Sequence, residues 1–159
     1  MNNEAPKPAA TEQATQEFVT VTIGDQLFGL LINEVQDVFM PSAITEVPLA
    51  AHEVAGVLNL RGRIVTAIDM RKRLGLPQRS EDEAEMAVGI EYNSESYGLV
   101  IDRVGEVHRL SNETFEANPA NLDPRWAAVS AGVHRLEGNL MVVLDVNKVL
   151  ALGHQALAA

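Results

Sequence analysis

The sequence predicts an all-β protein with short helices, built as two similar β-barrel subdomains that arose from an internal duplication. Three observations lead to this prediction. Short apolar runs alternate with turns that contain glycine, which is typical of β-hairpins. The same layout occurs twice along the chain. Small β units close most readily as barrels, because closure removes their exposed edges.

The composition sets limits on the fold and function. The chain has 159 residues, of which 47% are hydrophobic and only seven are aromatic, so its core must consist mainly of Val, Leu, Ile and Ala. The absence of Cys excludes a disulfide framework, a thiolate metal site and a cysteine nucleophile. The net charge of -10 argues against a general nucleic-acid binder, because phosphate repels an anionic protein unless a basic face is segregated.

The N-terminal residues 1–16 are rich in Ala, Pro, Gln, Thr and Glu, and we predict a disordered tail there. This stretch does not resemble a signal peptide, because no basic start precedes an apolar run. No stretch approaches the roughly 20 apolar residues of a membrane span. We expect one folded domain over residues 17–155 and a short C-terminal tail over 156–159.

In the first copy, residues 18–32 form two apolar strands around a Gly-Asp turn, and the segment INEVQDVF then predicts a short helical or irregular turn. Residues 55–69 form a second hairpin around Arg61, Gly62 and Arg63. The second copy repeats this order. Tyr97 follows Phe28 at an offset of 69 residues, and the run AGVHRLEGNLMVVLDVNKVL at 131–150 follows AGVLNLRGRIVTAIDMRKRL at an offset of 76.

A repeat of this size determines the architecture. We expect subdomains at about 18–78 and 79–155, joined at the acidic stretch QRSEDEAE, with the terminal segments free to cross between them. The runs IVTAI and LMVVL are apolar on both alternating faces, which predicts that both strands are covered on both sides and that the subdomains share an interface.

The ends of the two copies carry helix signals. Asp69 and Asp145 each follow an apolar strand and precede a helical pattern, so both are candidate N-caps. Gly75 and Gly153 lie where a helix commonly ends.

The sequence contains no recognisable catalytic or metal-binding constellation. His52, His108, His134 and His154 are scattered without short ligand spacing. No Gly-rich phosphate loop precedes a helix, and no serine lies in a nucleophile elbow. We therefore predict that the protein is not an enzyme and that it has no cofactor and no metal.

The Arg-Gly-Arg turn is the strongest candidate functional feature. Residues 56–76 hold five of the twelve Lys and Arg residues. Gly62 aligns with Gly138, but Arg61 aligns with Glu137 and Arg63 with Asn139, so the turn itself does not require arginine. Two interpretations remain open: a charged hairpin tip that adds solubility, or a recognition arginine whose fork suits a carboxylate. Asp37 is the candidate partner of Arg61 within the chain.

Two apolar features also have alternative interpretations. Val35, Val38 and Phe39 either end a strand with side chains in the core or offer an apolar patch to a partner helix. Trp126 lies in a polar loop and is either a packing plug, which we prefer, or an interface anchor.

The segments FVTVTIGDQLFGLLINEVQDV, ITEVPLAAHEVAGVLNLRGRIVTAIDMRKRLGL and YGLVIDRVGEV resemble the CheW-type chemotaxis coupling proteins. The resemblance covers about Phe18 to Leu150, and its most specific part is G-V-x-N-L-R-G-x-I-x-x-x-x-D-x-R from Gly56 to Arg71. It implies two SH3-like five-stranded β-barrels packed on a shared hydrophobic core.

The resemblance also implies a function. Members of this family are non-catalytic adaptors that bind both the cytoplasmic tip of chemoreceptors and the regulatory domain of the chemotaxis histidine kinase, so that receptor state controls kinase activity. The resemblance assigns partner binding, or the shaping of that surface, to Val35, Asp37, Gly56 and Arg61. It further implies a cytoplasmic protein, monomeric outside the signalling array, that reaches membrane receptors through its partners without inserting into the membrane.

The sequence departs from the family pattern at two positions, and one alternative function remains open. Family members typically have Glu at the position of Asp37 and a basic residue at the position of Glu46. The alternative function is a β-barrel module that binds nucleic acid or another polyanion through its basic cluster, which comprises Arg61, Arg63, Arg71, Lys72 and Arg73. Net charge and the scarcity of stacking aromatics argue against this alternative, so no nucleic-acid partner is expected.

Overall fold

The computed structural model describes residues 14–78 and 85–151, which form two packed β-sheets with short helical segments. The predicted tail over 1–16 lies mostly outside the described residues, as do most of the acidic stretch QRSEDEAE, the candidate helix end at Gly153 and the C-terminal tail over 156–159. The first described strand begins at Thr15. No helix in the described ranges combines the length and apolar character needed to span a bilayer.

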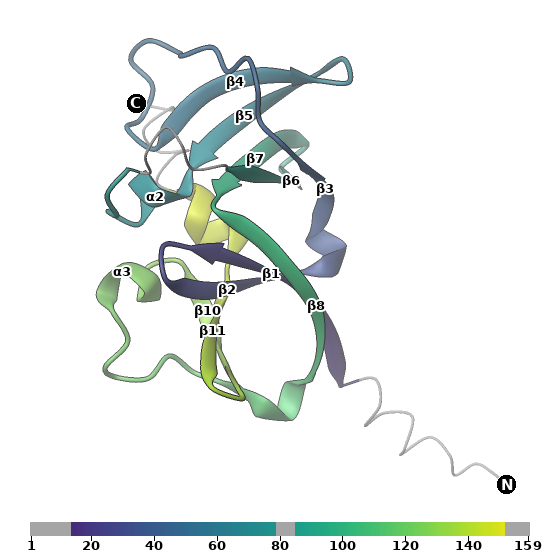
Figure 1. The fold of residues 1–159 in the computed structure, drawn as a ribbon, viewed down its shortest axis with the longest axis vertical. Coiled ribbons are helices and arrows are strands. Elements are labelled where there is room, and N and C mark those ends of the chain that lie inside the picture. The colour runs from purple at the N-terminus through teal and green to yellow at the C-terminus, as the bar shows by residue number, and fades with distance from the viewer. Residues whose placement is uncertain (1–13, 79–84, 152–159) are drawn as a thin grey trace, which may run out of the picture.

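The upper sheet in Figure 1 has five strands in the order β3-β6-β7-β5-β4. These strands are β3 (Val35–Phe39), β4 (Val54–Leu60), β5 (Arg63–Asp69), β6 (Met86–Tyr92) and β7 (Glu95–Ile101). The lower sheet has six strands in the order β8-β1-β2-β11-β10-β9. Its strands are β1 (Thr15–Ile23), β2 (Gln26–Leu31), β8 (Arg103–Ser111), β9 (Phe115–Glu116), β10 (Ser130–Leu136) and β11 (Asn139–Leu144).

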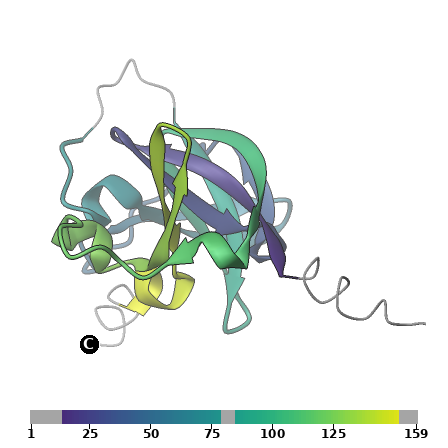
Figure 2. The same cartoon turned by 90° about the horizontal axis from the view of Figure 1, so that it is seen from below.

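The all-β fold with two related sheets is confirmed, and the sheets differ in strand number for a local reason. The long connection between β8 and β10 contributes the two-residue strand β9, which pairs with His134 and Val133 of β10. Short helical segments complete the fold: α2 (Met70–Arg73), α3 (Pro124–Ala127), two 3-10 turns (Ile32–Glu34 and Asn112–Thr114) and a helical stretch at residues 146–151. Viewed from below, β8 curves around one side of the lower sheet (Figure 2).

Each sheet combines strands from both halves of the sequence. Strands β1 and β2 belong to the sheet that holds β8–β11, whereas β6 and β7 belong to the sheet that holds β3–β5. The exchange is made by two parallel pairings, β11 with β2 and β5 with β7. The first aligns Val143 with Gly29 and the second aligns Ala67 with Gly98. Under the two sequence offsets these pairs are equivalent, so the exchange preserves the symmetry of the repeat.

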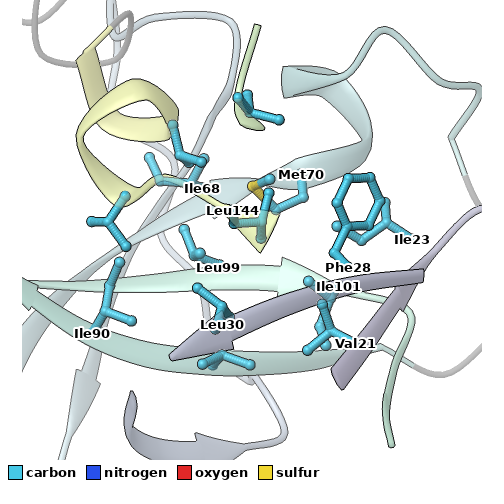
Figure 3. Close-up of a cluster of buried hydrophobic side chains, with 14 of the residues drawn as sticks. Val21, Ile23, Phe28, Leu30, Ile68, Met70, Ile90, Leu99, Ile101 and Leu144 are labelled. Atoms are coloured by element: carbon cyan, nitrogen blue, oxygen red, sulfur yellow. The ribbon is translucent and has the colours of Figure 1, made fainter. Parts of the chain in front are cut away.

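A single large core lies between the sheets, as the repeat predicted. It includes Val21, Phe28 and Leu30 from the lower sheet together with Ile90 and Leu99 from the upper sheet, and Figure 3 shows these side chains converging with those around them. Smaller clusters lie within each sheet, one around Phe39, Leu58, Val65, Ala67, Ala87 and Val100, the other around Phe18, Met141 and Val143.

The prediction that both central strands are covered on both faces is confirmed for one of them. In LMVVL, residues 141–144 are all buried. In IVTAI the first residue, Ile64, is 62% exposed, because it lies beside the tip of the β4–β5 hairpin, opposite the exposed Asn59. The segment INEVQDVF also differs from the prediction: only Ile32–Glu34 is a 3-10 turn, and Val35–Phe39 is the strand β3 because it pairs with β6.

The predicted helix caps and helix end are confirmed for the three that lie within the described residues, Asp69, Asp145 and Gly75. The Asp69 carboxylate accepts from Lys72 N as the N-cap of α2, and Asp145 accepts from Lys148 N at 3.3 Å. Gly75 has a φ of +72°, and its N–H donates to Lys72 O at the end of α2. Trp126 lies in α3 and packs edge-on against Phe28 with 5.7 Å between ring centroids, so packing is the observed role of this side chain.

Candidate functional site

The β4–β5 turn holds Arg61 in a fixed orientation. Arg61 and Gly62 are the two turn residues and both have positive φ, +54° and +84°, the geometry of a tight two-residue hairpin. The N–H of Gly62 donates to Asn59 Oδ1 at 2.9 Å and closes the turn. Asn59 and Gly62 therefore have the structural role in the hairpin, while Arg61 projects a largely exposed side chain, 72% accessible.

The ion pair expected between Asp37 and Arg61 is present. Arg61 Nη1 donates to Asp37 Oδ2 across the gap between the hairpin tip and β3. Asp37 is held by its own strand, because it lies opposite Gly89 of β6, where a side chain would crowd the Asp37 Cβ at 3.2 Å. Such a pair on the surface contributes at most about 1 kcal/mol to stability, so its main effect is to fix the position of both side chains.

The pair borders a pocket of about 420 Å³ on the five-stranded sheet. Its lining is mixed: it includes the apolar residues Phe39, Leu60 and Val65, and the charged pair Asp37 and Arg61 lies at its edge. A volume of this size lies in the range of small-ligand pockets. The remaining lining residues are Gln36, Arg63, Gly89, Ile90, Ser96 and Tyr97.

Tyr97 is a buried residue that lines this pocket. It is 3% exposed, and its Oη donates to Glu95 Oε1 at 2.9 Å. Burial, followed by the hydrogen bond to Glu95, raises the pKa of Tyr97 to about 12. The phenol therefore remains neutral and acts as a hydrogen-bond donor throughout the physiological range.

The other two predicted site residues lie away from this pocket. Val35 is on the same strand as Asp37, two residues earlier, and packs against the core between the sheets. Gly56 is buried beneath the segment that precedes β4: a Cβ at this position would lie 2.2 Å from Thr45 O, and φ is +145°. Gly56 thus allows Ile44 and Thr45 to approach the sheet. The structure brings Asp37 and Arg61 together, while Val35 and Gly56 support the surface from behind and beside it.

Sequence reasoning missed Ser96 and Tyr97, which belong to β7 in the second half of the chain. They reach the pocket because β6 and β7 join the sheet of β3–β5. The repeat contained a signal for one of them: Tyr97 aligns with Phe28, so the second copy has a hydroxyl where the first has an apolar ring. Val38 is 40% exposed while Phe39 is buried, so the apolar pair on β3 is divided between surface and core.

The basic cluster is dispersed in the folded protein. Arg71 pairs with Asp102 at 2.7 Å, and both side chains are only 15% exposed. Arg73 donates to Val149 O and Lys148 O, and burial lowers the pKa of Arg73. These two arginines hold helical segments in place and do not form a continuous surface with Arg61 and Arg63. A polyanion would therefore meet few of the five cations.

Within the described ranges 14–78 and 85–151, no group of three or more His, Cys, Asp or Glu side chains is placed to hold a metal ion. Among the residues that the structure describes, His134 has a buried side-chain nitrogen, Nε2, without a hydrogen-bond partner. It lies on β10 of the other sheet.

Comparisons with known proteins agree along nearly the whole chain. The family model described as CheW-like domain matches residues 17–153. The chemotaxis protein CheW of Thermotoga maritima is 30% identical over 136 residues, covering 84% of this chain and 87% of that protein. The chemotaxis protein CheW of Klebsiella aerogenes is 28% identical over 148 residues, covering 93% and 89%. The crystal structure of the scaffolding protein TtCheW from Thermoanaerobacter tengcongensis superposes with a TM-score of 0.73 at 26% identity, covering 82% of this chain and 88% of that one.

Proposed function

Because the chain belongs to the CheW-like family of non-catalytic chemotaxis scaffold proteins, we propose that it binds both the regulatory domain of a chemotaxis histidine kinase and the cytoplasmic tip of chemoreceptors. Binding both partners makes kinase activity depend on receptor state. The proposal places the protein in the cytoplasm, recruited to membrane receptor arrays through its partners, and monomeric outside the array. The proposed binding domain is residues 17–155, together with Thr15 and Gln16, which the predicted tail over 1–16 included but which begin β1.

The observation that carries the proposal is the family match over residues 17–153, and the geometry at Arg61 supports it. Arg61 is exposed and oriented by Asp37, and the equivalent turn of the second copy has Glu137 in place of Arg61. A charged pair that the fold does not require, fixed beside a pocket, suits recognition of another protein. Val35, Asp37, Gly56 and Arg61 are the residues proposed to bind partners or to shape this surface.

The test is direct binding of the full chain to two purified fragments, a receptor tip and a kinase regulatory domain. We expect both to bind with dissociation constants of about tens of micromolar or tighter, since transient signalling interfaces are often small. Arg61→Ala should weaken at least one interaction about fivefold, because a charged contact at an interface contributes on this scale. Failure of both fragments to bind the wild-type chain would contradict the proposal.

The matched control is Glu137→Ala, which truncates the equivalent turn residue of the β10–β11 hairpin. It should leave both affinities unchanged. Filter binding to single-stranded nucleic acid at moderate salt addresses the alternative function and should show no retention, because the basic cluster is dispersed and the chain carries a net charge of -10.

A further inference from the structure

The two arginines of the β4–β5 turn have different electrostatic surroundings. Arg61 is matched by the Asp37 carboxylate. Arg63, at the start of β5, lines the same pocket, and its hydrogen bond within the described residues runs from Nη1 to Ser96 Oγ at 3.3 Å. No carboxylate of the described chain lies within ion-pair distance of Arg63. The rim of the pocket therefore carries one cation whose charge is not matched nearby.

Ser96 completes a donor pair at this rim. Its Oγ accepts from Arg63, so its own O–H hydrogen is still available to donate, and no acceptor for it is found among the described residues. A forked guanidinium together with a hydroxyl can donate to both oxygens of a carboxylate. The same pocket is also lined by the apolar side chains of Phe39, Leu60 and Val65.

The internal repeat shows that this rim is not needed for folding. Arg63 aligns with Asn139 and Ser96 aligns with Leu27. The β10–β11 hairpin forms the same pairing with β2 without either polar group. The donor pair therefore distinguishes one copy from the other, while the strand geometry is common to both.

We propose that Arg63 and Ser96 form a recognition site for a carboxylate, an Asp or Glu side chain presented by one of the two protein partners. Arg61, paired with Asp37, remains part of the same binding surface, and Arg63 with Ser96 provides the donors to this carboxylate. Two arginines and one aspartate line the pocket, so it carries a local positive charge in a chain of net charge -10. This charge favours an acidic side chain of a partner over a basic or neutral one. This inference rests on the proposed function, because it names the chemistry of the partner at the same surface.

The experiment compares Arg63→Asn, which introduces the residue of the second copy, with the wild-type full chain against the receptor-tip and kinase fragments. We expect about a tenfold loss of affinity for one fragment and none for the other, because a charge-assisted hydrogen bond to a carboxylate is lost. Arg63→Lys keeps the charge without the fork and should lose less. The difference between wild type and Arg63→Asn should shrink at high salt, since salt screens exposed charges.

The control is Arg103→Asn, which removes an equal charge from an exposed position on β8 of the other sheet and should change neither affinity. Thermal unfolding of all variants should be unchanged, because Arg63 is exposed. If Arg63→Asn binds both fragments like wild type, or loses affinity only as much as Arg103→Asn does, the carboxylate site is overturned and the proposed function is unaffected. If the wild-type chain binds neither fragment, both proposals fail.

Discussion

His134 lies between two aromatic rings, with Phe18 at 5.2 Å and Phe115 at 5.3 Å between centroids, and is 1% exposed. The Thr114 hydroxyl donates to Ser111 O, so the 3.1 Å contact between Thr114 Oγ1 and His134 Nδ1 requires Nδ1 to carry the hydrogen. Nε2 then carries a lone pair and has no partner. A buried acceptor without a partner is tolerated, but a proton added there would create a buried, unmatched positive charge.

Stability should therefore fall as the solution becomes acidic. Burial lowers the pKa of His134, and this effect exceeds the opposing attraction of Glu116. A histidine whose pKa is lower in the folded state contributes its full stability above the unfolded pKa of about 6.5, and that stability is lost as the pH falls below this value. The nearby charges are Glu116 on β9 and Arg135 on β10, which pair with each other.

Urea denaturation between pH 7 and pH 5 measures this effect. Replacing His134 with Gln, which cannot be protonated, should lower stability at pH 7 but flatten the pH dependence over this interval. His108→Gln on β8 is the control and should keep the wild-type slope, since its ring is more exposed. Equal slopes for wild type and His134→Gln would show that His134 does not titrate in this way.

At the scale of strands, the two copies share a bulge at the same place. The register of β4 against β5 shifts between Val54 and Gly56, and that of β10 against β11 shifts between Ser130 and Gly132. Gly56 has a φ of +145° and Gly132 a φ of +149°, a region that is essentially restricted to glycine. In both copies backbone atoms of another segment, Thr45 or Glu116, occupy the space that a Cβ would need.

Gly56→Ala should lower the free energy of unfolding by about 3 kcal/mol or more, because it combines backbone strain with a backbone collision. Gly62→Ala is the matched control: its φ is also positive, but nothing lies within 4 Å of its Cβ position. That change should cost only about 1 kcal/mol. Chemical denaturation of the two variants provides the comparison, and equal losses would mean that the contact with Thr45 is not limiting.

Much of this element-scale structure could be predicted from the sequence, because alternation, turn residues and the repeat are all local signals. The sequence left the terminal segments free to cross between the subdomains, but it did not predict that the β6–β7 hairpin joins the sheet of β3–β5. Phe28 and Tyr97 occupy equivalent positions in two similar hairpins, so the local pattern does not determine which hairpin pairs with which half. The Asp37–Arg61 pair was predictable because both residues lie in the first copy. Ser96 was not, because it reaches the pocket only through that exchange.

At the scale of the molecule, a hydrogen-bonded ion pair that occurs in only one copy of the repeat links the two sheets. Asp102, between β7 and β8, accepts from Arg71 Nε at 3.0 Å and Nη2 at 2.7 Å, and from Gly24 N at 2.8 Å. It thus links α2, which follows the five-stranded sheet, to the β1–β2 turn of the six-stranded sheet. Under the sequence offsets, Arg71 corresponds to Asn147 and Asp102 to Asn33, so the equivalent junction lacks this ion pair.

We therefore expect the Arg71–Asp102 contact to contribute to the stability of the packing between the two sheets. Asp102→Ala should destabilise the protein by about 3 kcal/mol, because it removes a carboxylate that accepts two hydrogen bonds from Arg71 at a site where both side chains are only 15% exposed. The double variant with Arg71→Ala should lose clearly less than the sum of the single losses, since each single change already removes the contact between the two side chains. Urea denaturation of the four proteins gives this coupling energy.

The exposed pair Arg135–Glu116, with side chains 59% and 45% accessible, is the control and should show a coupling below about 1 kcal/mol. A coupling for Arg71–Asp102 no larger than that of the control would mean that apolar packing between the sheets is sufficient to hold them.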